Sequence, residues 1–244
     1  MTPHQRSVNP AAPAHSGSSG NGRKTHNAAH GQAHGSGQEQ GQGQISHETG
    51  HGLEPVSDWV QRWSHLVSEH GSVLDLACGR GRHLRWFAAR GHPVTGVDRS
   101  AQALKALSDL CGDSRVELVE ADIENGPWPL MHEGQPRQFD AVVVCNYLWR
   151  PLFPIILQSL SMHGVLLYET FAAGNASVGR PSRPDFLLKT GELLQVSASL
   201  RVVAYEDGFC EQPQRFVQRI AALRLPLQVE ESAAAAVTVP RYRL

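Results

Sequence analysis

The stretch Val73-Leu-Asp-Leu-Ala-Cys-Gly-Arg-Gly-Arg82 decides the fold. An apolar run that contains an acidic residue passes into a glycine-rich turn, and a helical pattern follows that Gly91 stops. A buried strand that feeds a tight turn and then a helix is how α/β proteins build nucleotide-type pockets. A second apolar strand, Val94 to Val97, ends at Asp98, roughly where a ribose-binding carboxylate is expected. The sequence therefore predicts a nucleotide-type pocket beside this turn.

The spacing of the glycines separates the classes of nucleotide ligand. A dinucleotide fingerprint needs G-x-G-x-x-G, because its pyrophosphate must sit on the helix N-terminus. Gly79 and Gly81 fit the first two positions, but Leu84 stands at the third. No Gly-Lys-Ser/Thr follows either, so a Walker-type phosphate loop is missing. The pattern favours a nucleoside ligand without phosphates.

The run D-L-A-C-G-R-G followed by V-T-G-V-D resembles the class I S-adenosylmethionine-dependent methyltransferases. The resemblance implies S-adenosyl-L-methionine as the cofactor. It also implies that Asp75 faces the methionine part, that the two glycines let the backbone approach the cofactor, and that Asp98 holds the ribose hydroxyls. Ala77 and Arg99 are expected to contact the cofactor as well. The alternative is a turn that only reverses the chain, with both Asp residues merely exposed at strand ends.

Short apolar strands alternate with helical segments along the rest of the chain. This alternation predicts a mostly parallel sheet covered on both faces. With the resemblance, it indicates an α/β, Rossmann-like, doubly wound, seven-stranded sheet with a C-terminal antiparallel hairpin. Helices are expected over 56–69 and 190–195. Strands are expected over 73–77, 94–97, 116–120, 139–144 and 165–168, with a hairpin of 200–205 and 216–223 that turns around Asp207-Gly208.

The first fifty or so residues differ in composition from the rest. They are rich in Gly, Ser, Gln, Asn and His, and such a segment buries too little apolar surface to offset its ordering entropy. We expect a disordered low-complexity tail over 1–52 and a methyltransferase domain over 53–244. Histidine-rich tracts can bind metal, but the spacing in the tail is irregular and no Cys joins it, so no metal site is expected.

Charge and cysteine usage bound the partners and the compartment. The formal net charge is −1, which offers no strong electrostatic case for nucleic acid. The 4 cysteines are far apart and form no C-x-x-C pair, as in reduced cytosolic proteins. No signal-peptide pattern or run of transmembrane length is present. We therefore expect a cytoplasmic protein without nucleic-acid or membrane partners, and its oligomeric state stays open.

The residues after each strand are the ones expected to reach a ligand, because open α/β sheets bind outside the carboxyl ends of their strands. After the third strand, the resemblance places Asp122 at the adenine amino group and Ile123 against the ring. Asp122 could instead cap its own loop. After the fourth strand, Cys145 or Asn146 is expected to contact the cofactor.

The same segment also holds three candidate substrate contacts. Tyr147, Trp149 and Arg150 together suit an anionic or planar substrate, through stacking and charge-assisted hydrogen bonds. Trp149 and its neighbours could instead pack the start of the next helix.

A long loop with Gly and Pro follows the fifth strand. Y-E-T-F-A-A-G-N and the later P-D-F-L-L-K-T-G-E-L-L resemble bacterial methyltransferases of the tellurite-resistance type. Long loops in compact domains are often functional lids, and Phe171 and Asn175 are candidate substrate contacts. Glu169 and Tyr147 are the candidate catalytic residues. A loop-fixing hydrogen bond is the alternative role for Glu169.

Three functions fit these patterns to different degrees. The first is an S-adenosylmethionine-dependent methyltransferase of small molecules, because the segment after the fourth strand lacks an N-P-P-Y amino-methylation signature. The second is a regulatory module that binds the cofactor without turnover. The third is a nicotinamide oxidoreductase, against which Leu84 argues.

Overall fold

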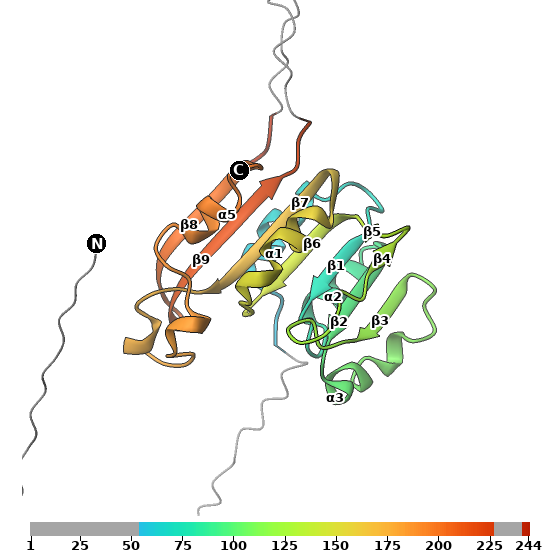
Figure 1. Cartoon of the computed structure of the whole chain (residues 1–244), viewed down its shortest axis with the longest axis horizontal. Helices are drawn as coiled ribbons and strands as arrows, with labels where there is room; N and C mark the ends of the chain where they lie inside the picture. Colours follow the sequence, from blue (N-terminus) through green and yellow to red (C-terminus); the bar gives the residue numbers. More distant parts are fainter. Residues whose placement is uncertain (1–53, 227–240) are drawn as a thin grey trace, which may run out of the picture. The chain divides into compact units, whose positions relative to one another are not determined.

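The computed structural model describes residues 54–226 and 241–244, so the predicted tail over 1–52 lies outside the described residues. One seven-stranded sheet with the order β3-β2-β1-β6-β7-β9-β8 dominates the described part (Figure 1). A small two-stranded sheet is formed by β4 (Met131–His132) and β5 (Gln135–Pro136). The large sheet comprises β1 (Val73–Leu76), β2 (Val94–Asp98), β3 (Val116–Glu120), β6 (Phe139–Cys145), β7 (Leu160–Phe171), β8 (Arg201–Glu211) and β9 (Gln214–Leu223).

The strand directions confirm the predicted doubly wound fold. β1, β2, β3, β6 and β7 pair in parallel, whereas β9 runs antiparallel to both β7 and β8. The chain moves outward from β1 to β3 and then returns to the other side of β1 as β6. The strand order therefore reverses between β1 and β6, and such a switch point is where open α/β sheets bind ligands.

Helices cover both faces of the sheet and bury two apolar clusters. Trp59 and Trp63 of α1 (Asp58–Trp63) pack in the same cluster as Phe87 of α2 (Arg82–Ala88) and Leu104 of α3 (Ala101–Lys105). The opposite face holds α4 (Phe153–Gln158) and α5 (Glu192–Val196). β1 is buried at every position, since it is covered on both sides. No helix within 54–226 or 241–244 is both long and apolar enough to cross a membrane.

The first helix is shorter than the sequence predicts. Its α-helical part covers 58–63, followed by a 3-10 turn over Ser64–Leu66. The side chain of Ser57 accepts a hydrogen bond from the backbone N–H of Trp59 and so caps the helix two residues inside the predicted start. Residues 54–56 are thereby left outside the helix, close to the switch point.

The predicted turn of the C-terminal hairpin was wrong. β8 runs through Asp207 and Gly208, which pair in register with Gln218 and Val217 of β9, and the turn lies at 212–213. Proline has no N–H for a sheet ladder, so Pro213 suits the turn better than a strand position. The hairpin itself is confirmed, with longer strands than expected.

Candidate active site

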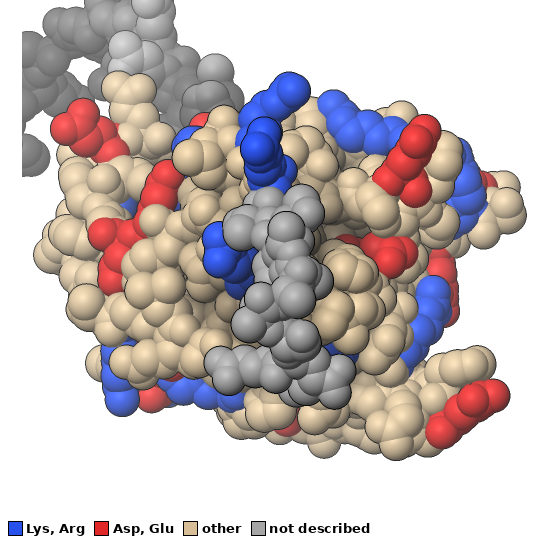
Figure 2. All heavy atoms as spheres, turned by 90° about the horizontal axis from the view of Figure 1, so that it is seen from above, with Lys and Arg blue, Asp and Glu red and all other residues tan. Residues whose placement is uncertain are grey.

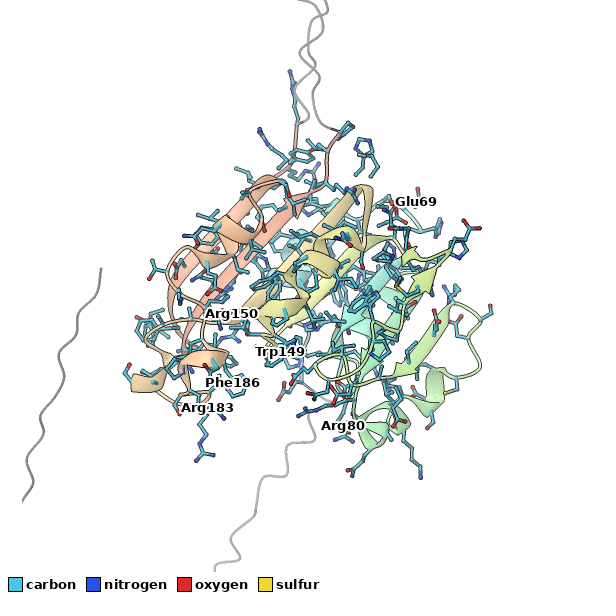
Figure 3. The ribbon with its side chains drawn as sticks, viewed as in Figure 1. Glu69, Arg80, Trp149, Arg150, Arg183 and Phe186 are labelled. Atoms are coloured by element: carbon cyan, nitrogen blue, oxygen red, sulfur yellow. The ribbon has the colours of Figure 1, made fainter. Side chains whose placement is uncertain are left out.

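The main cavity lies at the carboxyl ends of the parallel strands, where the switch point predicts a ligand. Its volume is about 420 Å³. In Figure 3, Arg80, Trp149 and Phe186 lie along this edge of the sheet, and Glu69 lies at the opposite end. The cavity is lined by Ala77, Asp98, Arg99, Ala121, Asp122, Ile123, Glu124, Asn146, Tyr147, Leu148, Thr170, Phe171, Pro181 and Phe186.

A smaller recess of about 190 Å³ adjoins the main cavity. Its walls include Asp75, Arg82, His83 and Cys145, and it shares Ala77 and Asn146 with the main cavity. The two spaces thus meet at shared lining residues, and we refer to them together as the cleft.

Ala77 and Asn146 form the border between the cavity and the recess with unusual backbone conformations. Both have positive φ, 54° and 55°, although neither is glycine. Ala77 directly follows β1 and Asn146 directly follows β6, and these two strands pair with one another. Strained residues of this kind persist where surrounding structure over-determines them, and they cluster at ligand sites. The border between the two spaces is therefore a candidate for the reacting centre.

Asp75 lies in the recess as a buried carboxylate. Its side chain accepts a 2.9 Å hydrogen bond from the backbone N–H of Leu84, yet burial raises the pKa of Asp75 to about 7. His83 lies 4.0 Å away, but burial lowers the pKa of this imidazole to about 3, so the ring is neutral. The carboxylate can therefore gain from a ligand ammonium, and Arg82 in the same recess offers a cation for a ligand carboxylate.

The glycine turn is held by the carboxylate that closes β2. The backbone N–H of Gly79 donates to Asp98 Oδ2 at 2.7 Å, and Ser100 N–H donates to Oδ1 at 2.8 Å. Gly79 and Gly81 have φ of +54° and +75°, which only glycine adopts at little cost. Each carboxylate oxygen keeps a lone pair beyond these bonds, so Asp98 can accept further hydrogen bonds from a diol in the cavity.

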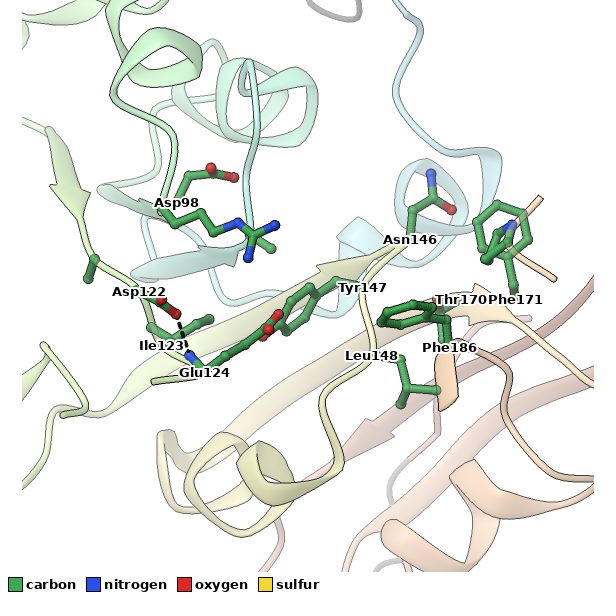
Figure 4. A pocket seen from close by; sticks show the side chains of 14 residues that line it. Asp98, Asp122, Ile123, Glu124, Asn146, Tyr147, Leu148, Thr170, Phe171 and Phe186 are labelled. Atoms are coloured by element: carbon green, nitrogen blue, oxygen red, sulfur yellow. Dashed lines mark hydrogen bonds between the residues drawn. The ribbon is translucent and has the colours of Figure 1, made fainter. Parts of the chain in front are cut away.

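Asp122 combines two roles that the sequence left open. Its Oδ1 accepts from the backbone N–H groups of Glu124 and Asn125, and its Oδ2 accepts from the Asn125 amide, so it caps its loop. These hydrogen bonds lower the pKa of Asp122. The same residue and the buried Ile123 line the cavity (Figure 4). Loop capping is therefore observed, and contact with a ligand is open to both residues.

The other half of the cavity is aromatic and apolar. Figure 4 places Phe186 and Leu148 across the cavity from Asp98 and Asp122, with Tyr147 between them. Burial and the nearby Glu124 carboxylate raise the pKa of Tyr147, so its hydroxyl stays protonated near neutral pH. Tyr147 is thus suited to donate a hydrogen bond rather than to take a proton.

Arg150 lies outside the lining of the cavity and binds the protein itself. Its Nε and Nη2 donate to the two carboxylate oxygens of Glu192 at 2.7 and 2.9 Å. Its Nη1 donates to the carbonyl of Asp185, and Nη2 also donates to that of Leu187, both at 2.9 Å. These contacts fasten the loop that carries Phe186.

Two other candidate substrate residues also have protein partners. Asn175 is 1% exposed; its Nδ2 donates to the carbonyl of Pro181 and its Oδ1 accepts from the N–H of Phe216. Trp149 is half-buried and packs against the core cluster that includes Ile156. Phe171 and Tyr147 are the candidate substrate contacts that do line the cavity.

Glu169 lies beside the cleft and is 1% exposed. Its Oε1 accepts from the hydroxyl of Ser57 at 3.1 Å and lies 3.5 Å from Arg215 Nη2, and its Oε2 lies 3.3 Å from Arg219 Nε. Cys145 is its register partner on β6, and burial together with the Glu169 and Asp75 carboxylates raises the pKa of that thiol. Glu169 therefore joins β7 and β9 to the segment before α1, and Cys145 stays a neutral thiol.

Some lining residues were not singled out from the sequence. Thr170, Pro181 and Phe186 belong to the long loop or its start, for which the sequence indicated a lid without naming these side chains. Arg82 is a further residue that the sequence does not single out: it lines the recess and donates to Glu54 at 3.3 Å. Its place as the first residue of α2, directly after the glycine turn, was the available signal.

The outer surface carries charges of both signs. On the face drawn in Figure 2, Lys and Arg side chains are interspersed with Asp and Glu.

All 4 cysteines lie within the described residues and are free thiols, as predicted.

Residues 73–163 match a family model described as a methyltransferase domain. YqeM of Bacillus subtilis strain 168, a protein named as a methyltransferase, is 29% identical over 129 residues, which are 49% of this chain and 50% of that protein. The chain thus spans about half the length of this curated relative.

Similar solved structures share the fold at low sequence identity. TehB of Haemophilus influenzae superposes with a TM-score of 0.56 at 17% identity, covering 69% of this chain and 62% of that one. An S-adenosylmethionine-dependent methyltransferase of Methanosarcina mazei gives 0.53 at 13% identity, covering 70% and 99%. One of Mesorhizobium loti gives 0.53 at 18%, covering 67% and 96%. The predicted fold, that of the class I S-adenosylmethionine-dependent methyltransferases, is confirmed.

Proposed function

We propose that this protein, whose fold is that of the class I S-adenosylmethionine-dependent methyltransferases, transfers the methyl group of S-adenosylmethionine to a small-molecule acceptor. The observation that carries the proposal is the cleft at the switch point. Its recess holds the buried carboxylate of Asp75, and its main cavity holds Asp98 on the glycine turn. Ala77 and Asn146 lie where the two spaces meet.

The residues of the cleft fit the parts of the cofactor in order. Asp75 would pair with the ammonium of the methionine part. Arg82, which lines the same recess and hydrogen-bonds to Glu54, would pair with the carboxylate of the methionine part. Asp98, with Arg99 beside it, would hold the ribose. Asp122 and Ile123 would contact the adenine, as lining residues farther along the same cavity.

In methyl transfer, the main contribution of the protein is to orient the cofactor and the acceptor. When bound, the cofactor supplies a methyl group on a positively charged sulfur; the acceptor atom bonds to that carbon as the carbon–sulfur bond breaks, and the electron pair stays on sulfur. The recess and the cavity would hold the two partners in line, which converts a bimolecular step into a nearly intramolecular one. Asn146 lines both spaces, and Cys145 lines the recess.

The role of Glu169 is best described as positioning. A general base must reach the proton that it removes, whereas Glu169 already contacts Ser57, Arg215 and Arg219. We assign it to holding the segment before α1 over the recess.

The free cysteines support the cytoplasm as the compartment, because oxidising compartments favour disulfides.

The experiment that tests the function is a turnover assay with an isotopically labelled methyl donor. The full chain is incubated with labelled S-adenosylmethionine and a broad panel of metabolites, and release of S-adenosylhomocysteine is measured together with transfer of label. Labelled product formed by the wild type and lost in Asp98→Ala supports the enzyme. Tight binding of S-adenosylhomocysteine without turnover on the whole panel would instead favour the regulatory module.

A further inference from the structure

We propose that the acceptor is a flat, apolar molecule, bound as an aromatic ring in the half of the cavity formed by Leu148, Thr170, Phe171, Pro181 and Phe186. This inference rests on the proposed function and names the substrate class of the same site. The two halves of the cavity differ in chemistry: the one toward β2 and β3 carries Asp98, Arg99, Asp122 and Glu124, whereas the other carries two phenyl rings, a leucine, a proline and one hydroxyl. Sites for small molecules combine apolar and aromatic walls with a few polar groups in this way.

Phe186 is the residue that most directly indicates a ligand. It lines the cavity and is still 41% exposed, although the Arg183 guanidinium lies 5.2 Å from the centre of its ring and a phenyl ring gains by leaving water. A planar ligand against this ring would cover it, and aromatic pairs add to the gain from burial through offset or edge-to-face contact. The exposed ring is therefore one wall of a site that a flat partner completes.

The loop that carries this wall is fixed by the protein. Arg150 binds the carbonyls of Asp185 and Leu187 on either side of Phe186, and Glu192 fixes the guanidinium through two hydrogen bonds. Asn175 holds the carbonyl of Pro181 in the same loop. A wall that is already ordered loses little entropy when a ligand binds, and this favours a small rigid acceptor.

Tyr147 stands between the two halves. Its side chain lines the cavity, while its hydroxyl is buried and hydrogen-bonds with the Glu124 side chain. The hydrogen bond fixes the ring at the border of the two halves, where it can pack against a flat ligand. The geometry thus suits an aromatic ring that contacts Tyr147 on the side of the cofactor half.

A matched pair of probes tests the shape and chemistry together. 2-Naphthol and decahydro-2-naphthol share their carbon skeleton and hydroxyl, but only the first is flat. Each is titrated by calorimetry into the full chain saturated with S-adenosylhomocysteine. We expect 2-naphthol to bind at least tenfold more tightly, and Phe186→Ala and Phe171→Ala to weaken it about fivefold to tenfold.

The controls separate this inference from the proposed function. Phe209→Ala removes a similarly exposed ring (44%) on β8 outside the cavity and should leave 2-naphthol binding unchanged. Phe186→Leu keeps an apolar side chain without the ring and should still weaken binding. Equal affinity for the two naphthols, no saturable binding of 2-naphthol, or unchanged binding in both Phe→Ala variants would overturn the inference. Failure of the wild type to bind S-adenosylhomocysteine would instead overturn the proposed function.

Discussion

Asp98 closes β2 and accepts a 2.7 Å hydrogen bond from the backbone N–H of Gly79, so one carboxylate holds the glycine turn and also faces the cavity. Its second oxygen accepts from Ser100, at the N-cap of α3. These contacts keep the carboxylate from rotating away. A ligand diol would therefore meet an acceptor that is already oriented.

Asp98→Ala should weaken binding of S-adenosylhomocysteine by about 10-fold to 100-fold, since hydrogen bonds to a charged group contribute about 1.5–3 kcal/mol. Calorimetry on the purified full chain measures the change. Asp109→Ala is the matched control, because that carboxylate pairs with Arg85 away from the cavity. Wild-type affinity in Asp98→Ala would show that the ribose assignment is wrong.

Asp75 should make both stability and cofactor binding depend on pH. Its pKa is raised to about 7 in the fold from an ordinary value of 3.8, so the folded protein without ligand binds an extra proton between these values. The free energy of unfolding should therefore fall as pH rises from about 4 to 7. Asp75→Asn should remove this slope in urea unfolding measured at several pH values.

The same carboxylate should bind the ligand ammonium only when it is ionised. The affinity for S-adenosylhomocysteine should rise with pH up to about 7 and then level off, with proton release visible as a dependence of the binding enthalpy on the buffer. An affinity that is flat from pH 5 to 8 in the wild type would contradict the placement of the ammonium at Asp75.

Substitution of Arg150 should weaken binding of the acceptor and leave binding of the cofactor unchanged. Arg150→Lys keeps the positive charge but loses the forked geometry that reaches Glu192 and two carbonyls. We expect 2-naphthol to bind about tenfold more weakly, whereas S-adenosylhomocysteine binds as in the wild type. Arg115→Lys, which loses a forked pairing with Asp113 away from the cavity lining, is the control. Equal losses for both ligands would indicate general damage to the fold.

Glu169→Gln should cost stability. The substitution keeps the shape of the side chain but leaves Arg215 and Arg219 facing a neutral amide, and breaking a buried ion pair costs about 3–5 kcal/mol. Both arginines are partly exposed, so we expect about 2 kcal/mol in chemical unfolding. Full wild-type stability together with complete loss of turnover would favour a catalytic base instead.

The strand ends of the cofactor half could be predicted because they depend on local pattern. Asp98 is the last residue of β2, and Asp75 is the last residue but one of β1. Parallel strands bring their carboxyl ends to one edge of the sheet. The glycine turn between them allows few backbone conformations. Position along the chain therefore determines position in space for these residues.

The acceptor half could be predicted only in part: Tyr147 and Phe171 line the cavity as the sequence indicates, whereas Arg150 does not. Arg150 meets partners 35 to 42 residues away, and no periodicity tells which way an arginine after a strand points. It was expected to meet a substrate, and its donors are instead bound to the loop. The turn of the last hairpin was misplaced for a similar reason: the pairing of Asp207 with β9 outweighs the turn preference of Asp-Gly.

Binding of S-adenosylhomocysteine to the wild-type full chain, measured by calorimetry beside NAD, tests the central claim most directly. The cleft at the switch point predicts saturable binding of one S-adenosylhomocysteine per chain, with no heat from NAD beyond dilution. Absence of S-adenosylhomocysteine binding, or saturable binding of NAD in its place, would contradict it.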